Sequence, residues 1–157
     1  MKGIGLLSTR SLWLIDIENL AWDQTRNTVT AERVQAVAEG IQRISWPYQK
    51  QEVIASSPHL SGLVGFSWGR PVRLLQRPGM DGADKELIQV ISTENIAGRF
   101  GVVVIASGDN IFTEEVIKLK SKGAQVFVAA TELGHLSKKL ESVAHGVIQL
   151  PSGTPPV

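Results

Sequence analysis

The chain alternates short apolar segments with amphipathic ones, and this alternation limits its fold more than any other feature. The apolar segments are rich in β-branched and aliphatic residues, as buried strands are: residues 12–17, 52–56, 72–76, 102–107, 125–129 and 147–150. The segments between them carry apolar residues at helical spacing: 31–44, 58–66, 83–97, 113–122 and 136–144. We therefore predict an α/β protein with a three-layer, Rossmann-like fold, in which helices cover both faces of a mostly parallel sheet of about five or six strands.

The length and composition fit one domain. The chain has 157 residues, of which 43% are hydrophobic and 20% are charged, close to the average for soluble globular proteins. We assign residues 1–150 to this domain. The final segment, residues 151–157, is short, polar and rich in proline, so we expect a disordered tail there.

Composition also excludes several classes of protein. The absence of cysteine excludes a disulfide scaffold, a thiolate zinc site and a cysteine nucleophile. No apolar run reaches the roughly 20 residues of a membrane-spanning helix, and the first residues lack a signal-peptide cleavage site, so we expect a cytoplasmic protein without membrane contact. The formal net charge is +1, so any binding of nucleic acid needs a local basic patch. The sequence leaves a homo-oligomer open.

Three aspartates fall where a parallel sheet binds its ligands, outside the carboxyl ends of the strands. Asp16 stands in the last part of the first strand, Asp109 follows the strand at 102–107, and Asp84 lies in the first turn of the helix at 83–97. Carboxylates that converge within about 4 Å repel one another by several kcal/mol, so this cluster needs a cation. Ligands that are all oxygen favour Mg²⁺ or Mn²⁺ over zinc or copper. Such an ion can polarise a phosphodiester and activate a bound water.

The segments around these acids are LWLIDIENL, GADKELI and VVIASGDNIF, in this order. They resemble the three motifs of NYN domains, a branch of the PIN-like ribonucleases: an apolar strand ending D-x-x-N, a helix starting with D-x-x-L, and a strand ending S-G-D-x-D-F. The resemblance spans residues 12–130. It implies a PIN-like fold, a magnesium or manganese cofactor and a single-stranded RNA substrate, with DNA left open. It also implies the catalytic residues: the metal-binding Asp16, Asp84 and Asp109, with Asn19 and Ser107 orienting the first and last.

One position departs from the NYN pattern. Ile111 stands where the family has the second aspartate of S-G-D-x-D-F. If that acid holds a second metal or the attacking water, activity is reduced, lost or shifted to another residue, for which Glu18, Asn110 and Glu114 are the candidates. Two hypotheses follow: a metal-dependent endoribonuclease, and a domain that has lost catalysis and serves as an RNA-binding or protein-interaction module. A phosphatase or phosphoacceptor domain ranks last, because IDIEN lacks a D-x-D-x-T continuation.

A run of basic residues leads into the acidic motif at Asp84. Its members are Arg70, Arg73, Arg77 and Lys85. A polyanion needs a basic rim to approach clustered carboxylates, so we predict that these residues bind substrate, together with Asn110. An equally weighted alternative makes Arg73 and Arg77 ordinary edge-strand or turn residues.

The tryptophans offer a second route to nucleic-acid binding. Trp13 lies within the first predicted strand and should belong to the core. Trp22, Trp46 and Trp68 fall in loops or near helix ends, where an aromatic ring can stack on an unpaired base. Packing is the favoured interpretation for each of them.

Overall fold

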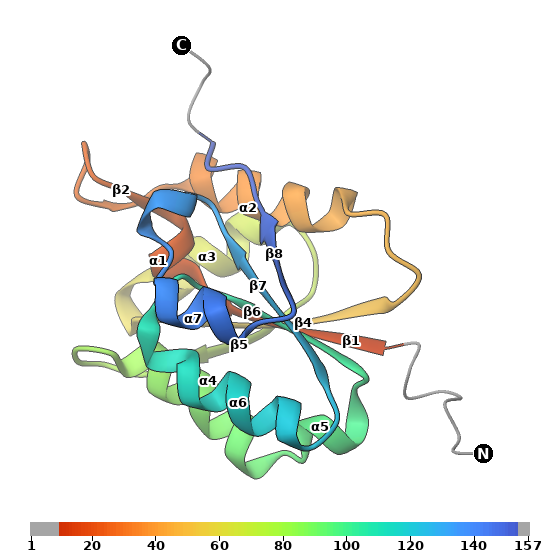
Figure 1. Cartoon of the computed structure of the whole chain (residues 1–157). Coiled ribbons are helices and arrows are strands. Elements are labelled where there is room, and N and C mark those ends of the chain that lie inside the picture. Colours follow the sequence, from red (N-terminus) through yellow and green to blue (C-terminus); the bar gives the residue numbers. More distant parts are fainter. Residues whose placement is uncertain (1–9, 154–157) are drawn as a thin grey trace.

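A six-stranded parallel sheet forms the middle layer of the protein (Figure 1). The structure is a computed structural model, and it describes residues 10–153. The strands are β1 (Arg10–Asp16), β4 (Gln49–Ser56), β5 (Arg73–Gln76), β6 (Val102–Ala106), β7 (Gln125–Ala130) and β8 (Gly146–Gln149). Their order is β5-β4-β1-β6-β7-β8, and every neighbouring pair is parallel. The predicted α/β class and parallel sheet are confirmed.

Helices cover both faces of this sheet and complete the three layers. On one face lie α1 (Ile17–Ala21), α2 (Ala31–Arg43) and α3 (Ser61–Trp68); on the other lie α4 (Gly82–Thr93), α5 (Ile96–Arg99), α6 (Thr113–Ser121) and α7 (Lys138–Val143). Successive side chains of a strand point to opposite faces. In β1, Leu12 and Leu14 therefore join the core under α4–α7, whereas Trp13 and Ile15 join the core under α1–α3. Burial on both faces explains why this strand reads as a continuous apolar run.

Several short elements are absent from the sequence prediction. A hairpin of β2 (Trp22–Asp23) and β3 (Thr28–Val29) follows α1 and extends beyond the sheet (Figure 1). Turns of 3₁₀ helix occupy Asn110–Phe112 and Leu133–His135, while a third, Pro58–Leu60, begins the helical segment that is predicted at residues 58–66. The single helix expected at 83–97 is divided into α4 and α5 near Asn95, whose φ of 51° is left-handed.

The end of the described chain lies against α2. A Cβ atom on Gly40 would come within 2.4 Å of the Pro151 ring, and a Cβ on Gly153 would lie 3.2 Å from the side chain of Ala36. Residues 151–153, the first part of the expected tail, therefore pack against α2. Residues 154–157 of that tail, and residues 1–9 of the assigned domain, lie outside the described residues. Within residues 10–153, no helix is long and apolar enough to span a bilayer.

The strand order creates a crevice at β1. From β1 the chain builds β4 and β5 on one side, then crosses back to build β6, β7 and β8 on the other. Connections before β5 carry α2 and α3, and those after it carry α4–α7 on the opposite face. In open α/β sheets the carboxyl ends of the strands at such a switch point flank the ligand site. Asp16, at the end of β1, and Asp109, just after β6, lie at this crevice.

Candidate metal centre

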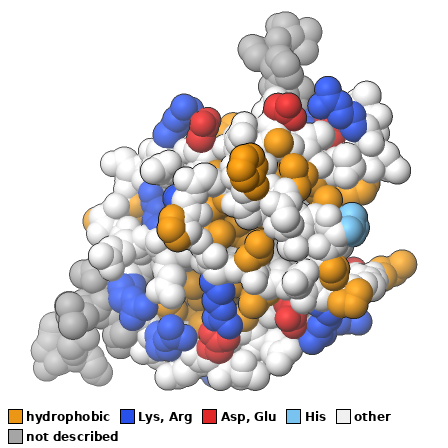
Figure 2. Space-filling view, turned by 180° about the vertical axis from the view of Figure 1, so that it is seen from behind, with side chains coloured by type: hydrophobic (Ala, Val, Ile, Leu, Met, Phe, Trp, Pro, Cys, Tyr) orange, Lys and Arg blue, Asp and Glu red, His pale blue; other side chains and the backbone are white. Residues whose placement is uncertain are grey.

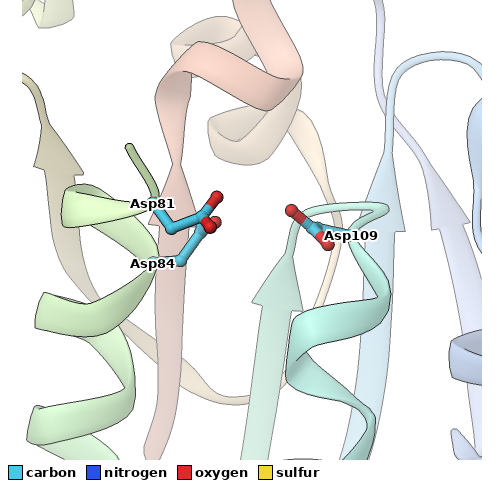
Figure 3. A group of neighbouring side chains, drawn as sticks. All are labelled: Asp81, Asp84 and Asp109. Atoms are coloured by element: carbon cyan, nitrogen blue, oxygen red, sulfur yellow. The ribbon is translucent and has the colours of Figure 1, made fainter. Parts of the chain in front are cut away.

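Three carboxylates meet at this crevice. Asp81, Asp84 and Asp109 each offer one oxygen atom, and these oxygens all lie within 4.8 Å of one another. Figure 3 shows Asp81 and Asp84 at the start of α4, facing Asp109 on the turn after β6. Together with Asp16 they line a cavity of about 300 Å³. The cluster therefore combines acids from two segments that are distant in the sequence.

The loop before α4 is shaped to bring Asp81 beside Asp84. Asp81 is the N-cap of α4 and has a left-handed φ of 59°. It precedes Asp84 by three positions, so the two side chains lie on the same side of the first turn. A Cβ on the next residue, Gly82, would lie 2.4 Å from the carbonyl oxygen of Arg77. This close approach requires glycine and fixes the path of the loop.

Asp16 is buried next to the cluster and contacts it through Asp84. Its carboxyl group hydrogen-bonds to that of Asp84, and its Oδ2 accepts a hydrogen bond of 3.0 Å from the Ser107 hydroxyl. Asp16 is not among the residues whose oxygens lie within 4.8 Å of one another. The structure thus joins Asp84 and Asp109 of the predicted trio with Asp81, and it places Asp16 behind them as the partner of Asp84.

Burial and like charges make this site costly to ionise. The pKa of Asp84 rises to about 9, first because the carboxyl is buried and then because of the hydrogen bond and charge of Asp16 and the charges of Asp109 and Asp81. Burial also raises the pKa of Asp16. Without a cation, the Asp16–Asp84 pair therefore holds a proton at neutral pH. A divalent cation would offset the repulsion and displace that proton.

Ser107 and Asn19 hold the turn that carries Asp109. The Ser107 hydroxyl accepts the backbone N–H of Asp109 at 3.1 Å, and Oδ1 of Asn19 accepts the N–H of Gly108 at 3.0 Å. Oδ1 of Asp109 in turn accepts the N–H of Ile111 at 3.0 Å. The bond to Asn19 ties the turn after β6 to α1. Ser107 thus contacts Asp109, which it is predicted to orient, whereas the side chain of Asn19, predicted to orient Asp16, holds the turn of Asp109.

A fifth acid that lines the cavity, Glu18, is held by Ser57. The backbone N–H of Ser57 donates to Oε2 of Glu18 at 2.8 Å, and the Ser57 hydroxyl lies 3.1 and 2.8 Å from its two carboxylate oxygens. The other two candidate replacements for the NYN acid are elsewhere. Asn110 accepts a hydrogen bond of 2.9 Å from Thr113, and Glu114 is exposed on α6. Neither Asn110 nor Glu114 lines the cavity.

Two of the predicted substrate-binding arginines are engaged in ion pairs away from the cavity. Arg70 donates to both oxygens of Glu52 in the middle of β4. Arg73 forms two hydrogen bonds of 2.7 Å with Glu94 at the end of α4. The ten residues from Asp84 to Glu94 correspond to about 15 Å of helix. The structure therefore does not bring Arg70 and Arg73 to the acidic cluster.

Arg77 and Lys85 are the members of the predicted basic rim that flank the start of α4. The guanidinium of Arg77 lies 3.2 Å from Glu86 and also donates to Gln89 at 3.1 Å. Lys85 follows Asp84 directly and is exposed. On the face shown in Figure 2, Lys and Arg side chains are spread among acidic and apolar ones. Because Arg70 and Arg73 are paired elsewhere, the basic rim is smaller than the sequence suggests.

Comparison with known proteins finds a likeness of fold and no family match. No family model matches the sequence, and no curated protein matches it. Among solved structures, the chain is similar to the crystal structure of a protein of unknown function from Vibrio parahaemolyticus, with a TM-score of 0.66. The similarity covers 98% of each chain at 16% sequence identity. At this identity the two proteins share a fold, and the likeness carries no statement about activity.

Proposed function

We propose that this protein is a metal-dependent ribonuclease that hydrolyses phosphodiester bonds of single-stranded RNA. The observation that carries the proposal is the cluster of Asp81, Asp84 and Asp109, whose oxygens lie within 4.8 Å of one another at the switch point of the sheet. Carboxylate ligands of this kind suit Mg²⁺ or Mn²⁺. The resemblance of three ordered motifs to those of NYN domains supports RNA as the substrate.

The donor set fits a divalent cation. Asp81, Asp84 and Asp109 would hold the ion, and the pKa of Asp84 is raised first by burial and then by the hydrogen bond and charge of Asp16 and the charges of Asp109 and Asp81. An ion bound there would polarise a phosphoryl oxygen of the substrate and lower the pKa of a bound water. Asp16 and Ser107 position the ligands from behind. Glu18, fixed by Ser57 at the rim of the same cavity, is placed to accept the proton of the attacking water.

Ile111 is compatible with this function. Its side chain packs against the core under α4–α7 and does not line the cavity. Asp81 brings an additional carboxylate to the cavity from the opposite side, on the loop before α4. Four aspartates, Asp16, Asp81, Asp84 and Asp109, thus line the cavity without an acid at position 111.

Cleavage of labelled single-stranded RNA with added Mn²⁺ tests the proposal. Asp109→Asn keeps an oxygen that can accept the Ile111 N–H, so the turn should persist while the charge is lost. We expect cleavage to fall by about 100-fold or more, a loss of roughly 2.7 kcal/mol of transition-state stabilisation. Glu114→Gln, on an exposed part of α6, is the matched control and should retain full activity. Equal cleavage by the wild type and Asp109→Asn would exclude this mechanism.

A catalytically impaired RNA-binding or protein-interaction module is the second candidate. Two observations favour it: Ile111 replaces an acid of the NYN pattern, and the Asp16–Asp84 pair is satisfied by a proton without any metal. RNA binding that persists in EDTA, with no cleavage in Mg²⁺ or Mn²⁺, would establish this module in place of the enzyme.

A further inference from the structure

A second cavity adjoins the metal centre beside the β2–β3 hairpin, and we call it the hairpin pocket. Its volume is about 380 Å³, and its lining includes Asn19, Trp22, Arg33, Gly108, Thr131 and His135. Asn19 lines both cavities, while Gly108 lines the hairpin pocket and its neighbour Asp109 lines the metal centre. A chain that crosses Asn19 therefore passes from one cavity directly into the other.

Hydrogen bonds fasten the walls of the hairpin pocket to each other and to the metal centre. The Thr131 hydroxyl, after β7, donates to the carbonyl oxygen of Leu20 in α1 at 3.0 Å. Next to Leu20 in the same helix, Asn19 accepts the N–H of Gly108, and the carbonyl of Gly108 accepts the N–H of Ser137 at 2.9 Å. The pocket is thus preformed, as ligand pockets usually are, and its position relative to the metal-binding turn is fixed.

The chemistry of the hairpin pocket suits a neutral, flat ligand. Trp22 lines it and is 38% exposed, so part of its indole ring is open to a ligand. The guanidinium of Arg33 lies 3.6 Å from Asp23 and donates to the Trp22 carbonyl, and His135 lies 3.4 Å from Glu132. Because acids accompany both basic groups, the pocket is better suited to a nucleobase than to a phosphate. Bases stack on exposed aromatic rings, and single-stranded RNA presents them unpaired.

We propose that the hairpin pocket binds the base of the nucleotide next to the scissile phosphate, with Trp22 stacking on that base. This inference rests on the proposed ribonuclease, because it places the adjoining phosphate over Asp81, Asp84 and Asp109. The oxygen of the Asn19 carboxamide accepts the N–H of Gly108, and this exposed residue lines both cavities and carries an amide NH₂ donor. Asn19 can therefore donate a hydrogen bond to the nucleotide that crosses there.

Binding of a labelled RNA trinucleotide to the Asp109→Asn protein tests the pocket without cleavage. Trp22→Ala should weaken this binding by about tenfold or more, the scale of one base–aromatic stack. Phe66→Ala is the matched control, because Phe66 is 90% exposed on α3 and lines neither cavity. Trp22→Phe keeps a ring and should recover most of the affinity. Equal binding by the Trp22→Ala and Phe66→Ala proteins, or equal losses for Trp22→Ala and Trp22→Phe, would overturn the stacking proposal.

A second pair of measurements separates this inference from the proposed function. The affinity of the otherwise wild-type Trp22→Ala protein for Mn²⁺ should be unchanged, because Trp22 does not line the metal cavity. If the wild-type protein binds RNA, loses that binding in Trp22→Ala and cleaves nothing in Mn²⁺, the ribonuclease proposal is wrong and the base pocket stands. If the wild type cleaves RNA and Trp22→Ala cleaves it with an unchanged KM, the ribonuclease proposal stands and the base pocket is wrong.

Discussion

The carboxyl groups of Asp16 and Asp84 hydrogen-bond to each other at the edge of the acidic cluster. Two ionised carboxylates offer only acceptors, so this bond needs a proton. The pKa of Asp84, raised to about 9 chiefly by burial, keeps that proton in place at neutral pH. In the proposed enzyme, the metal ion and the proton therefore compete for the same carboxylate.

The raised pKa of Asp84 predicts how the stability of the metal-free protein depends on pH. The folded state keeps the Asp84 proton up to about pH 9, whereas the unfolded chain releases it near the ordinary value of 3.8. The folded state binds more protons between these values, so the free energy of unfolding falls as pH rises through this interval. Asp84→Asn removes the titrating group and should flatten that decline.

Thermal unfolding in EDTA across this pH range measures the effect. Near pH 9, the free energy of unfolding of Asp84→Asn should exceed that of the wild type by about 1–2 kcal/mol. Each kcal/mol corresponds to roughly 2–4 °C in Tm. Addition of Mn²⁺ should raise the Tm of the wild type much more than that of the variant. Parallel pH curves for the two proteins would contradict the assignment of the proton to the Asp16–Asp84 pair.

Asp81 should contribute directly to metal binding. It is exposed, and its neutral replacement Asp81→Asn should leave the fold intact. Loss of this ligand should weaken Mn²⁺ binding at least as much as loss of an outer-shell contact does, by about 10–100-fold, in a calorimetric titration. Glu39→Gln removes one charge from the exposed side of α2 and serves as the control. An unchanged affinity in Asp81→Asn would leave Asp16 as the third ligand.

The loop before α4 should tolerate no side chain at position 82. Gly82→Ala places a Cβ 2.4 Å from the Arg77 carbonyl oxygen, which should cost about 1–3 kcal/mol in urea unfolding and also weaken Mn²⁺ binding. Gly62, in the first turn of α3, meets nothing within 4 Å. Gly62→Ala should therefore stabilise the protein by about 0.5–1 kcal/mol through helix propensity. Similar effects of the two substitutions would show that the close approach at Gly82 is unimportant.

Introducing an acid at position 111, where the NYN pattern has one, should not improve metal binding. The Ile111 side chain packs against the core, so Ile111→Asp should lower the free energy of unfolding by about 1–3 kcal/mol and leave the affinity for Mn²⁺ no higher. Ile117→Asp, at a position that is 46% exposed on α6, is the control and should change stability by less than about 1 kcal/mol. Tighter Mn²⁺ binding by Ile111→Asp would mean that the side chain reaches the cavity.

Much of the fold is readable from the sequence because it depends on long apolar patterns. Strands buried on both faces, such as Leu12–Asp16 within β1, read as continuous runs, and α2 shows a clear apolar stripe after its Thr30 cap. The five-residue α1 and the two-residue strands of the hairpin are too short to show a period. Their positions depend on tertiary contacts such as the bond from Thr131 to Leu20.

The site is only partly readable for a related reason. Asp16, Asp84 and Asp109 stand at positions that strand and helix ends define, so their proximity follows from the topology. Asp81 lies in a loop whose left-handed residue and tight glycine contact have no periodic signal, although its spacing of three from Asp84 is a visible clue. Ion-pair partners such as Glu94 for Arg73 are set by the fold, so a basic run alone misplaces the rim.

The acidic cluster is complete only when β6 has paired with β1. Ser107, just after β6, contacts Asp16 of β1 across 91 residues. Among the neighbouring strands of the described sheet, β1 and β6 are the pair furthest apart in sequence. Contacts of such high sequence separation carry a large loop-closure entropy and form slowly. A nascent chain that ends before β6 contains Asp16, Asp81 and Asp84 but lacks the turn that completes the cluster. The acidic cluster is therefore complete only after the two halves of the polypeptide have joined, and in the proposed enzyme an unfinished chain would lack the full set of metal ligands.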